Sequence, residues 1–142
     1  MFSKEESKQL RQEFWVSFGK SFPRKWTLYQ TTIKDFSFKF HFDQKQAMVS
    51  IDVENQDLEK RIELWEKLES LRSILIMEYL PNANFNDSII LENGKEISRI
   101  WVTKTNVSIH NKNTWQETME FLRDTMLKIE AFYTEFEDII KP

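Results

Sequence analysis

The feature that most constrains the fold is a strict heptad repeat of large apolar residues near the C-terminus. Their spacing alternates between four and three residues: Trp115, Met119, Leu122, Met126, Ile129, Tyr133, Phe136 and Ile140. This spacing places the side chains on one stripe of a single long helix. A second, broken stripe of Phe121, Phe132 and Ile139 widens the apolar face. We expect this helix to lie across a sheet of the same chain, because the face is wider than a coiled-coil seam. Pairing with a second copy is the alternative.

Helix start signals occur at three further points along the chain. Ser3 and Glu6 have the spacing of a capping box, and an amphipathic helix with Phe14 and Phe18 on its apolar side follows. Asn55 is the expected N-cap of a second helix that Pro81 stops. A second capping box, Thr114 to Glu117, is expected to open the heptad helix.

Two hairpins are predicted between these helices. In residues 36–42, Phe alternates with polar residues, which is the period of a strand with one aromatic face. The polar break at residues 43–46 and the alternation from Val49 to Val53 indicate a partner strand, with Phe42 opposite Ala47. Asn93-Gly94 lies between two apolar runs and predicts a second hairpin with a type I′ turn. Residues 81–86 are expected to form a loop, and residues 107–110 to continue the sheet or add a short strand.

The predicted fold is therefore a single α+β domain over residues 1–142. With only 2 Gly and 3 Pro, the chain has few sites that break regular elements, and it contains no linker or repeat. The order αββαββ(β)α predicts a mainly antiparallel sheet of two hairpins with helices packed on one face.

Composition excludes several classes of protein. With 0 Cys and 2 His, the chain has neither a disulfide framework nor thiolate or His-rich metal sites. Its two glycines, Gly19 and Gly94, cannot form a Gly-rich phosphate loop. No apolar run is long enough to span a membrane, and the start of the chain is too charged for a signal peptide. We therefore expect a cytoplasmic protein without a membrane association.

Three carboxylates form the one candidate metal site in the sequence. The predicted hairpin register places Asp35 opposite Glu54, next to Asp52, with Lys39 two residues away. Opposed carboxylates need compensation, and a hard cation such as Mg²⁺ would supply it. This layout resembles metal-dependent nucleases of the restriction-endonuclease type. It departs from them because Asp52-Val53-Glu54 ends in Glu where that pattern has Lys, so only Lys39 could take the role of the lysine. The alternative is that these are ordinary polar residues of a sheet surface.

A basic segment with interleaved aromatic residues is the candidate binding surface. Such residues can neutralise phosphates and stack on bases. The candidate binding residues are Lys20, Arg24, Lys25, Trp26, Tyr29 and Lys34. The alternative is that the rings fill the edge of the core while the lysines are solvated. A net charge of −3 argues against a protein whose whole surface binds nucleic acid.

Four segments together resemble a known family. They are Leu10–Gly19, the Phe-rich strand with Ile51-Asp52-Val53-Glu54, Ile97-Ser98-Arg99-Ile100, and Asn111-Lys112-Asn113-Thr114-Trp115. In order and spacing they resemble domain of unknown function family 4268. Its members occur in bacteria and archaea, alone or attached after nuclease domains. The resemblance implies a link to nucleic-acid transactions or defence and transfers no catalytic residue.

We therefore expect an interaction module without enzymatic activity or cofactor. Its partner would be a protein, a second copy bound through the 114–140 helix, or nucleic acid bound through the basic segment. The alternative function is a metal-dependent or degenerate nuclease that uses Asp35, Lys39, Asp52 and Glu54 with Mg²⁺.

Overall fold

The structure is a computed structural model that describes residues 2–142. Seven principal elements follow one another along the chain: α1 (Lys4–Ser21), β1 (Phe36–Phe42), β2 (Gln46–Val53), α2 (Leu58–Ser70), β3 (Asn84–Ile90), β4 (Glu96–Thr105) and α4 (Trp115–Ile140). Three short helical pieces lie between them: α3 (Arg72–Ile74), the π-helical turn Leu75–Tyr79 and the 3₁₀ turn Lys112–Thr114. This order confirms the predicted α+β class.

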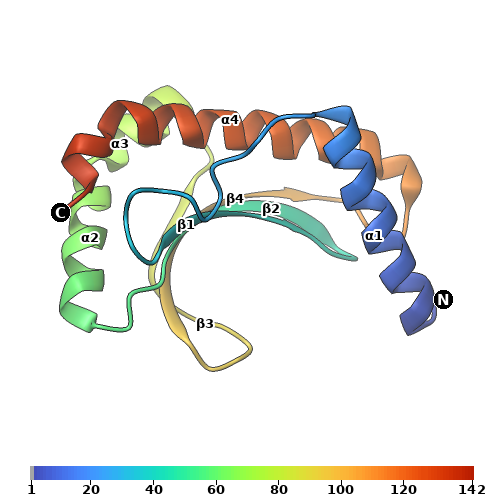
Figure 1. Ribbon diagram of the computed structural model, residues 1–142, viewed down its shortest axis with the longest axis horizontal. Helices are drawn as coiled ribbons and strands as arrows, with labels where there is room; N and C mark the ends of the chain where they lie inside the picture. Colours follow the sequence, from blue (N-terminus) through green and yellow to red (C-terminus); the bar gives the residue numbers. More distant parts are fainter. Residues whose placement is uncertain (1) are drawn as a thin grey trace.

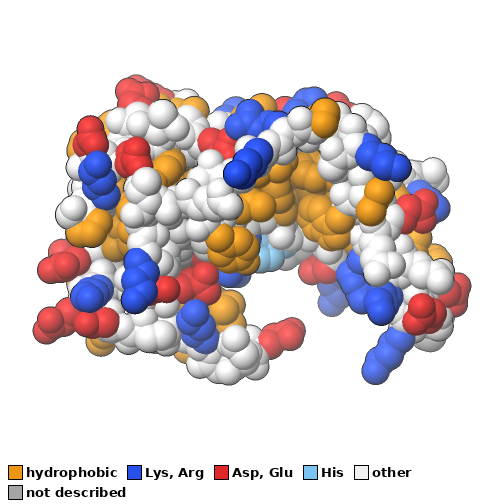
Figure 2. Space-filling view, viewed as in Figure 1, with side chains coloured by type: hydrophobic (Ala, Val, Ile, Leu, Met, Phe, Trp, Pro, Cys, Tyr) orange, Lys and Arg blue, Asp and Glu red, His pale blue; other side chains and the backbone are white. Residues whose placement is uncertain are grey.

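The four strands form one antiparallel sheet in the order β1-β2-β4-β3. Phe42 lies opposite Ala47 and Phe36 opposite Val53, so the predicted register of the first hairpin is correct. The long helix α4 runs along one face of the curved sheet, with α1 at one end and α2 at the other (Figure 1). No helix of the described chain covers the opposite, concave face. Figure 2 shows that this side is hollowed between α1 and the β3–β4 hairpin.

The core is the layer between α4 and the sheet. Alternate residues of β1, β2 and β4, among them Phe38, Ile51 and Ile100, are buried on the face toward α4. Leu122 and Met126 of α4 are likewise fully buried. Apart from the half-buried Phe136, every residue of the heptad stripe is buried in this layer. The stripe therefore packs within the chain, as expected for a helix that lies across a sheet of the same chain, and is not available to a second copy.

Aromatic contacts hold α1 against the end of the sheet. The ring centroid of Phe14 lies 4.6 Å from that of Phe42 and 5.3 Å from that of Trp115. The predicted capping box is present, since the Ser3 hydroxyl accepts from the Glu6 N–H and the Glu6 carboxylate accepts from the Ser3 N–H. The helix start predicted from the local sequence and the aromatic packing of α1 against the sheet are thus both present in the structure.

Two predicted N-terminal caps differ from the structure. The α2 N-cap is Asp57 rather than Asn55, because the chain needs two more residues beyond β2 to turn, and the Asp57 carboxylate accepts from the Glu59 N–H. Thr114 is the N-cap of α4, as predicted, but it forms no capping box, because its hydroxyl accepts from the Ser108 N–H and donates to backbone carbonyls of the preceding loop.

The second hairpin also differs in detail from its prediction. Gly94 has a φ of +84°, but Asn93 is not left-handed, so the turn is not type I′. The Asn93 side chain accepts from the Lys95 N–H instead, which stabilises a longer turn. β3 begins at Asn84, inside the predicted loop, and residues 107–110 form no strand. In the described part of the chain, none of the helices combines the length and apolarity that crossing a membrane requires.

Two leucines of α4 provide a test of this packing. Leu122→Ala should lower the free energy of unfolding by about 2–5 kcal/mol, because it leaves a cavity under the helix. Leu127→Ala should cost well under about 1 kcal/mol, because Leu127 is 37% exposed. Urea unfolding of both variants measures the difference. A wild-type melting temperature that rises with protein concentration would contradict burial of the stripe within one chain.

Candidate functional site

The face of the sheet that no helix of the described chain covers carries a polar cluster. Apolar side chains at these positions would be exposed to solvent. The side chains that alternate with the core positions include Lys39, His41, Ser50, Asp52, Arg99 and Trp101. Antiparallel pairing places Asp52 directly opposite Arg99 and opposite Ser37 on its other side. The alternation along each strand and the pairing of neighbouring strands therefore bring these polar side chains together on one face.

Asp52 is the centre of this cluster. Its side chain is 0% exposed, although no helix covers this face. The Arg99 guanidinium donates from Nε at 2.8 Å and from Nη2 at 2.9 Å, and Lys39 Nζ lies 3.3 Å away. Burial by itself raises the pKa of Asp52, but the hydrogen bonds and charge of Arg99, together with Lys39, outweigh it and lower the pKa. Asp52 is thus an ionised carboxylate held by two cations.

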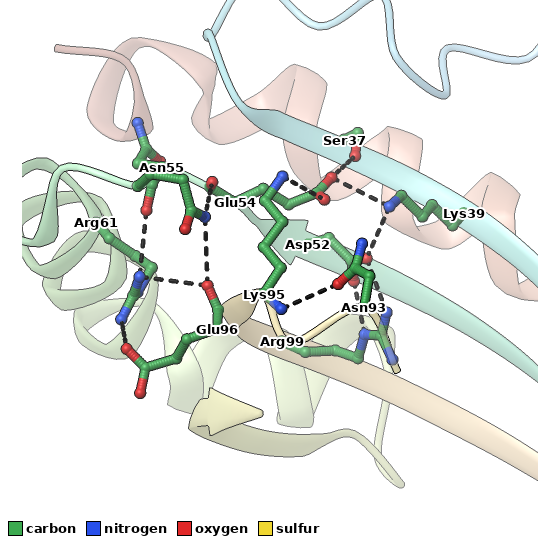
Figure 3. A network of polar contacts seen from close by, with 11 residues as sticks. Ser37, Lys39, Asp52, Glu54, Asn55, Arg61, Asn93, Lys95, Glu96 and Arg99 are labelled. Atoms are coloured by element: carbon green, nitrogen blue, oxygen red, sulfur yellow. Dashed lines mark hydrogen bonds and ion pairs between the residues drawn. The ribbon is translucent and has the colours of Figure 1, made fainter. Parts of the chain in front are cut away.

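Glu54 extends the cluster toward the end of the first hairpin. Its carboxylate lies 3.1 Å from Lys39 Nζ and 3.4 Å from Lys95 Nζ, and it accepts from the Ser37 hydroxyl at 3.3 Å (Figure 3). Burial lowers the pKa of Lys39, but the hydrogen bond to Glu54 and the charges of Asp52 and Glu54 outweigh this effect and raise it. Three cations therefore surround two carboxylates.

A second ion pair ties α2 to β4 beside this cluster. The buried Arg61 donates to the Glu96 carboxylate and to the backbone carbonyls of Asn55 and Glu96 (Figure 3). These contacts position the start of α2, which is a structural role.

His41 is a neutral hydrogen-bonding residue within the cluster. Its Nε2 lies 3.0 Å from the Ser50 hydroxyl. Burial lowers the pKa of His41 to about 4, with a further contribution from the positive charge of Arg99. His41 is therefore a largely buried member of the cluster, although its strand position lies on the uncovered face.

The carboxylates of the metal hypothesis do not form a cation site. The described residues contain no group of three or more His, Cys, Asp or Glu placed to hold a metal ion. The oxygens of Asp52 and Glu54 face Arg99, Lys39 and Lys95 instead, so protein cations supply the compensation that Mg²⁺ was expected to supply. Lys39, Asp52 and Glu54 are thus brought together as an ion-pair network, whereas Asp35 is exposed and forms no ion pair within residues 2–142.

The basic segment divides into anchored and free residues. Glu130 of α4 accepts from Arg24 Nη2 at 2.6 Å and from the Thr27 N–H at 2.7 Å. Trp26 packs 5.5 Å from Phe40, and Arg24 lies over its ring. Arg24 and Trp26 therefore hold the segment on the core. Three predicted residues, Lys20, Lys25 and Lys34, are exposed and form no ion pair within residues 2–142.

Tyr29 projects from a turn that is itself firmly held. The Gln30 N–H donates to the Thr27 carbonyl, and the Phe38 N–H of β1 donates to the Leu28 carbonyl. Leu28 has a φ of +43°, a conformation that costs an L-residue about 1–2 kcal/mol. The Tyr29 ring is nevertheless 70% exposed, with Lys39 Nζ 5.6 Å from its centroid. The fold thus fixes the backbone of Tyr29 and leaves its ring in solvent.

A hollow of about 430 Å³ brings the two predicted residue sets together. We call it the corner hollow, and its lining is Tyr29, Thr31, Thr32, Ile33, Lys34, Asp35, Phe36, Ser37 and Glu54. Tyr29 and Lys34 belong to the predicted binding set, and Asp35 and Glu54 to the predicted carboxylate set. A larger cavity of about 530 Å³ lies on the other side of residues 33–35, against α2.

Sequence reasoning missed several residues of this region. The partners Lys95 and Arg99 come from the second hairpin, and only the pairing of β2 with β4 reveals them. The hydroxyls of Thr31, Thr32 and Ser37 carried no sequence signal. Phe85, which had no predicted place, packs against Trp65 and lies under Arg72, so it is structural.

The fold and the polar sheet face define a two-layer α+β protein with one uncovered sheet face. Over residues 10–137 the chain matches the model of the family "Domain of unknown function (DUF4268)", and it belongs to that family. No curated protein and no solved structure matches the chain.

The buried ion pair provides one test of the cluster. Asp52→Asn should lower the free energy of unfolding by about 3–5 kcal/mol, because it leaves Arg99 without its partner. Asp87→Asn, at an exposed site on β3, should change it by no more than about 0.5 kcal/mol. Chemical denaturation of both variants is the measurement, and an equally mild effect of Asp52→Asn would contradict the description of the cluster.

His41 provides a second test through pH. Its folded pKa of about 4 lies below the unfolded value of 6.5, so the folded state binds fewer protons between these values. Stability should therefore fall as pH decreases through this window, by roughly 1–2 kcal/mol between pH 7 and pH 5. His41→Gln should reduce this slope between pH 7 and pH 5. Between pH 7 and pH 8, the pH dependence of the free energy of unfolding should be the same in the variant and in the wild type. Urea titrations at each pH measure it, and an unaltered slope in the variant would refute the assignment.

Proposed function

We propose that this protein is a non-enzymatic module that binds single-stranded nucleic acid at the corner hollow. The observation that carries the proposal is the exposed ring of Tyr29, which a held turn of backbone places beside the hollow and which is not part of the core. An aromatic ring of this kind is a platform on which a nucleobase can stack. Such stacking tolerates any base, because every base has a π-face. Lys34 lines the same hollow and is a suitable phosphate contact.

Exposed basic residues beyond the hollow support this choice, because a strand bound at the hollow extends past it. Lys20 and Lys25 are exposed and unpaired within the described chain, and α1, at the other end of the sheet from the hollow, adds further exposed basic residues, Lys4, Lys8 and Arg11. Lys and Arg side chains gather on the inner flank of α1 in Figure 2, facing the hollowed side of the molecule. Phosphate contacts of this kind need only a local patch, so they are compatible with the overall net charge of −3.

Two observations favour this function over the alternatives. The heptad stripe lies within the protein's own core, which removes the basis for self-association through α4. The carboxylates of the nuclease hypothesis are bound by Lys39, Lys95 and Arg99, which supports binding rather than catalysis. A cytoplasmic location would suit such a partner.

Fluorescence anisotropy with a labelled oligothymidylate tests the proposal. Tyr29→Ala should weaken binding by about five- to a hundredfold, because stacking on one base is worth about 1–3 kcal/mol. Lys34→Ala should weaken binding less and reduce its dependence on salt. Met77→Ala is the control for loss of an exposed apolar side chain, since Met77 is 84% exposed on the π-helical turn. Lys128→Ala is the corresponding control for an exposed lysine of α4.

No measurable binding at low salt would refute the proposal. Equal affinities for wild type and Tyr29→Ala would refute the assigned surface, provided that both proteins melt at similar temperatures.

A further inference from the structure

The inner wall of the corner hollow offers acceptors to a ligand, because its Ser and Thr hydroxyl donors are already used. The Thr31 hydroxyl donates to the carbonyl of Phe36 at 2.6 Å. The Thr32 hydroxyl donates to the Glu137 carboxylate at 2.6 Å, and the Ser37 hydroxyl donates to Glu54. A ligand that fills the hollow therefore finds no free Ser or Thr hydroxyl donor on its wall, and the hydroxyl of Tyr29 is the one that remains unpaired within residues 2–142.

The acceptors that remain in the hollow are carboxylates. Glu54 already meets Lys39, Lys95 and Ser37, which leaves capacity on its oxygens, because a carboxylate has about four acceptor positions. Asp35 is exposed at the mouth of the hollow. A carboxylate repels phosphate but binds a hydroxyl that donates to it. The hollow therefore suits a ligand that brings hydroxyl donors of its own.

We propose that the nucleic acid taken by the corner hollow is RNA, with Glu54 accepting a hydrogen bond from a ribose 2′-hydroxyl. This inference rests on the proposed function. The 2′-hydroxyl is the group that distinguishes RNA from DNA, and it is both a donor and an acceptor. One nucleotide would place its base on the exposed face of Tyr29, its ribose toward Glu54 and its phosphate toward Lys34. All three side chains line the same hollow of about 430 Å³.

The spatial order of these groups agrees with this assignment. Lys39 lies between the two contacts, with its Nζ 5.6 Å from the Tyr29 ring centroid and 3.1 Å from the Glu54 carboxylate. Lys39 and Lys95 offset the negative charge of Glu54, so a carboxylate near a phosphodiester chain is tolerated.

Three labelled ligands test the inference on the wild-type protein: oligouridylate, oligodeoxyuridylate and 2′-O-methyl oligouridylate of equal length. The first two differ only at the 2′ position, and the third keeps the 2′ oxygen without its donor hydrogen. We expect the RNA to bind about tenfold more tightly than the other two, the magnitude expected for a hydrogen bond to a charged group.

Glu54→Gln tests the residue. This variant should bring the affinities of oligouridylate and oligodeoxyuridylate to within about twofold of each other, because the amide is a weaker acceptor. Glu96→Gln is the matched control, since Glu96 is the carboxylate of the neighbouring ion pair and does not line the hollow. It should leave the preference for RNA unchanged.

Each outcome decides between the two proposals. Equal binding of RNA and DNA by the wild type overturns this inference and leaves the proposed function standing, whereas no binding of any strand overturns the proposed function. Tight binding of the 2′-O-methyl strand would refute a donor role of the hydroxyl. A preference that persists in Glu54→Gln would refute Glu54 as the acceptor. The three ligands on wild type remain decisive if the variant does not fold.

Discussion

Burial of the α4 stripe against one face of the sheet is the interaction on which the remaining structure depends. A single helix with an apolar stripe of this length must cover an extended surface, and the aligned Phe, Val and Ile residues of β1, β2 and β4 provide it. Once α4 occupies that face, the charged residues that alternate along the strands must lie on the other face. The polar surface is thus a consequence of the core.

This arrangement explains why Asp52 can be buried without a covering helix. Because Asp52 lies opposite Arg99 on the neighbouring strand, the guanidinium binds it in a bidentate manner, with one N–H donating to each carboxylate oxygen. Lys39 and Arg99 cover it from solvent and satisfy its charge together. The same pairing neutralises the carboxylates, so protein cations rather than a metal ion compensate their charge.

The segment between α1 and β1 connects the core to the candidate site. Glu130 and the free edge of β1 hold its backbone at Thr27 and Leu28, so the backbone that carries the exposed Tyr29 ring is fixed in position. Preorganisation of this kind lowers the entropy cost of binding a ligand. The acidic C-terminal half of α4 therefore serves to position the basic segment within the same molecule.

Local patterns in the sequence were sufficient for the element order, the α1 capping box and the register of the first hairpin. The reason is that each depends on neighbours in the chain: alternation at Phe36–Phe42, spacing in α1, and the short break at residues 43–46. The pairing of Asp52 with Arg99, the anchoring of Arg24 by Glu130, and the meeting of Tyr29 with Glu54 were decided only by the tertiary structure. These contacts join residues far apart in sequence, and no local pattern records which distant partner will satisfy a charge. The sequence by itself therefore determined a two-layer α+β protein with one polar sheet face, and the packing of its layers determined which of those polar groups remain free for a ligand.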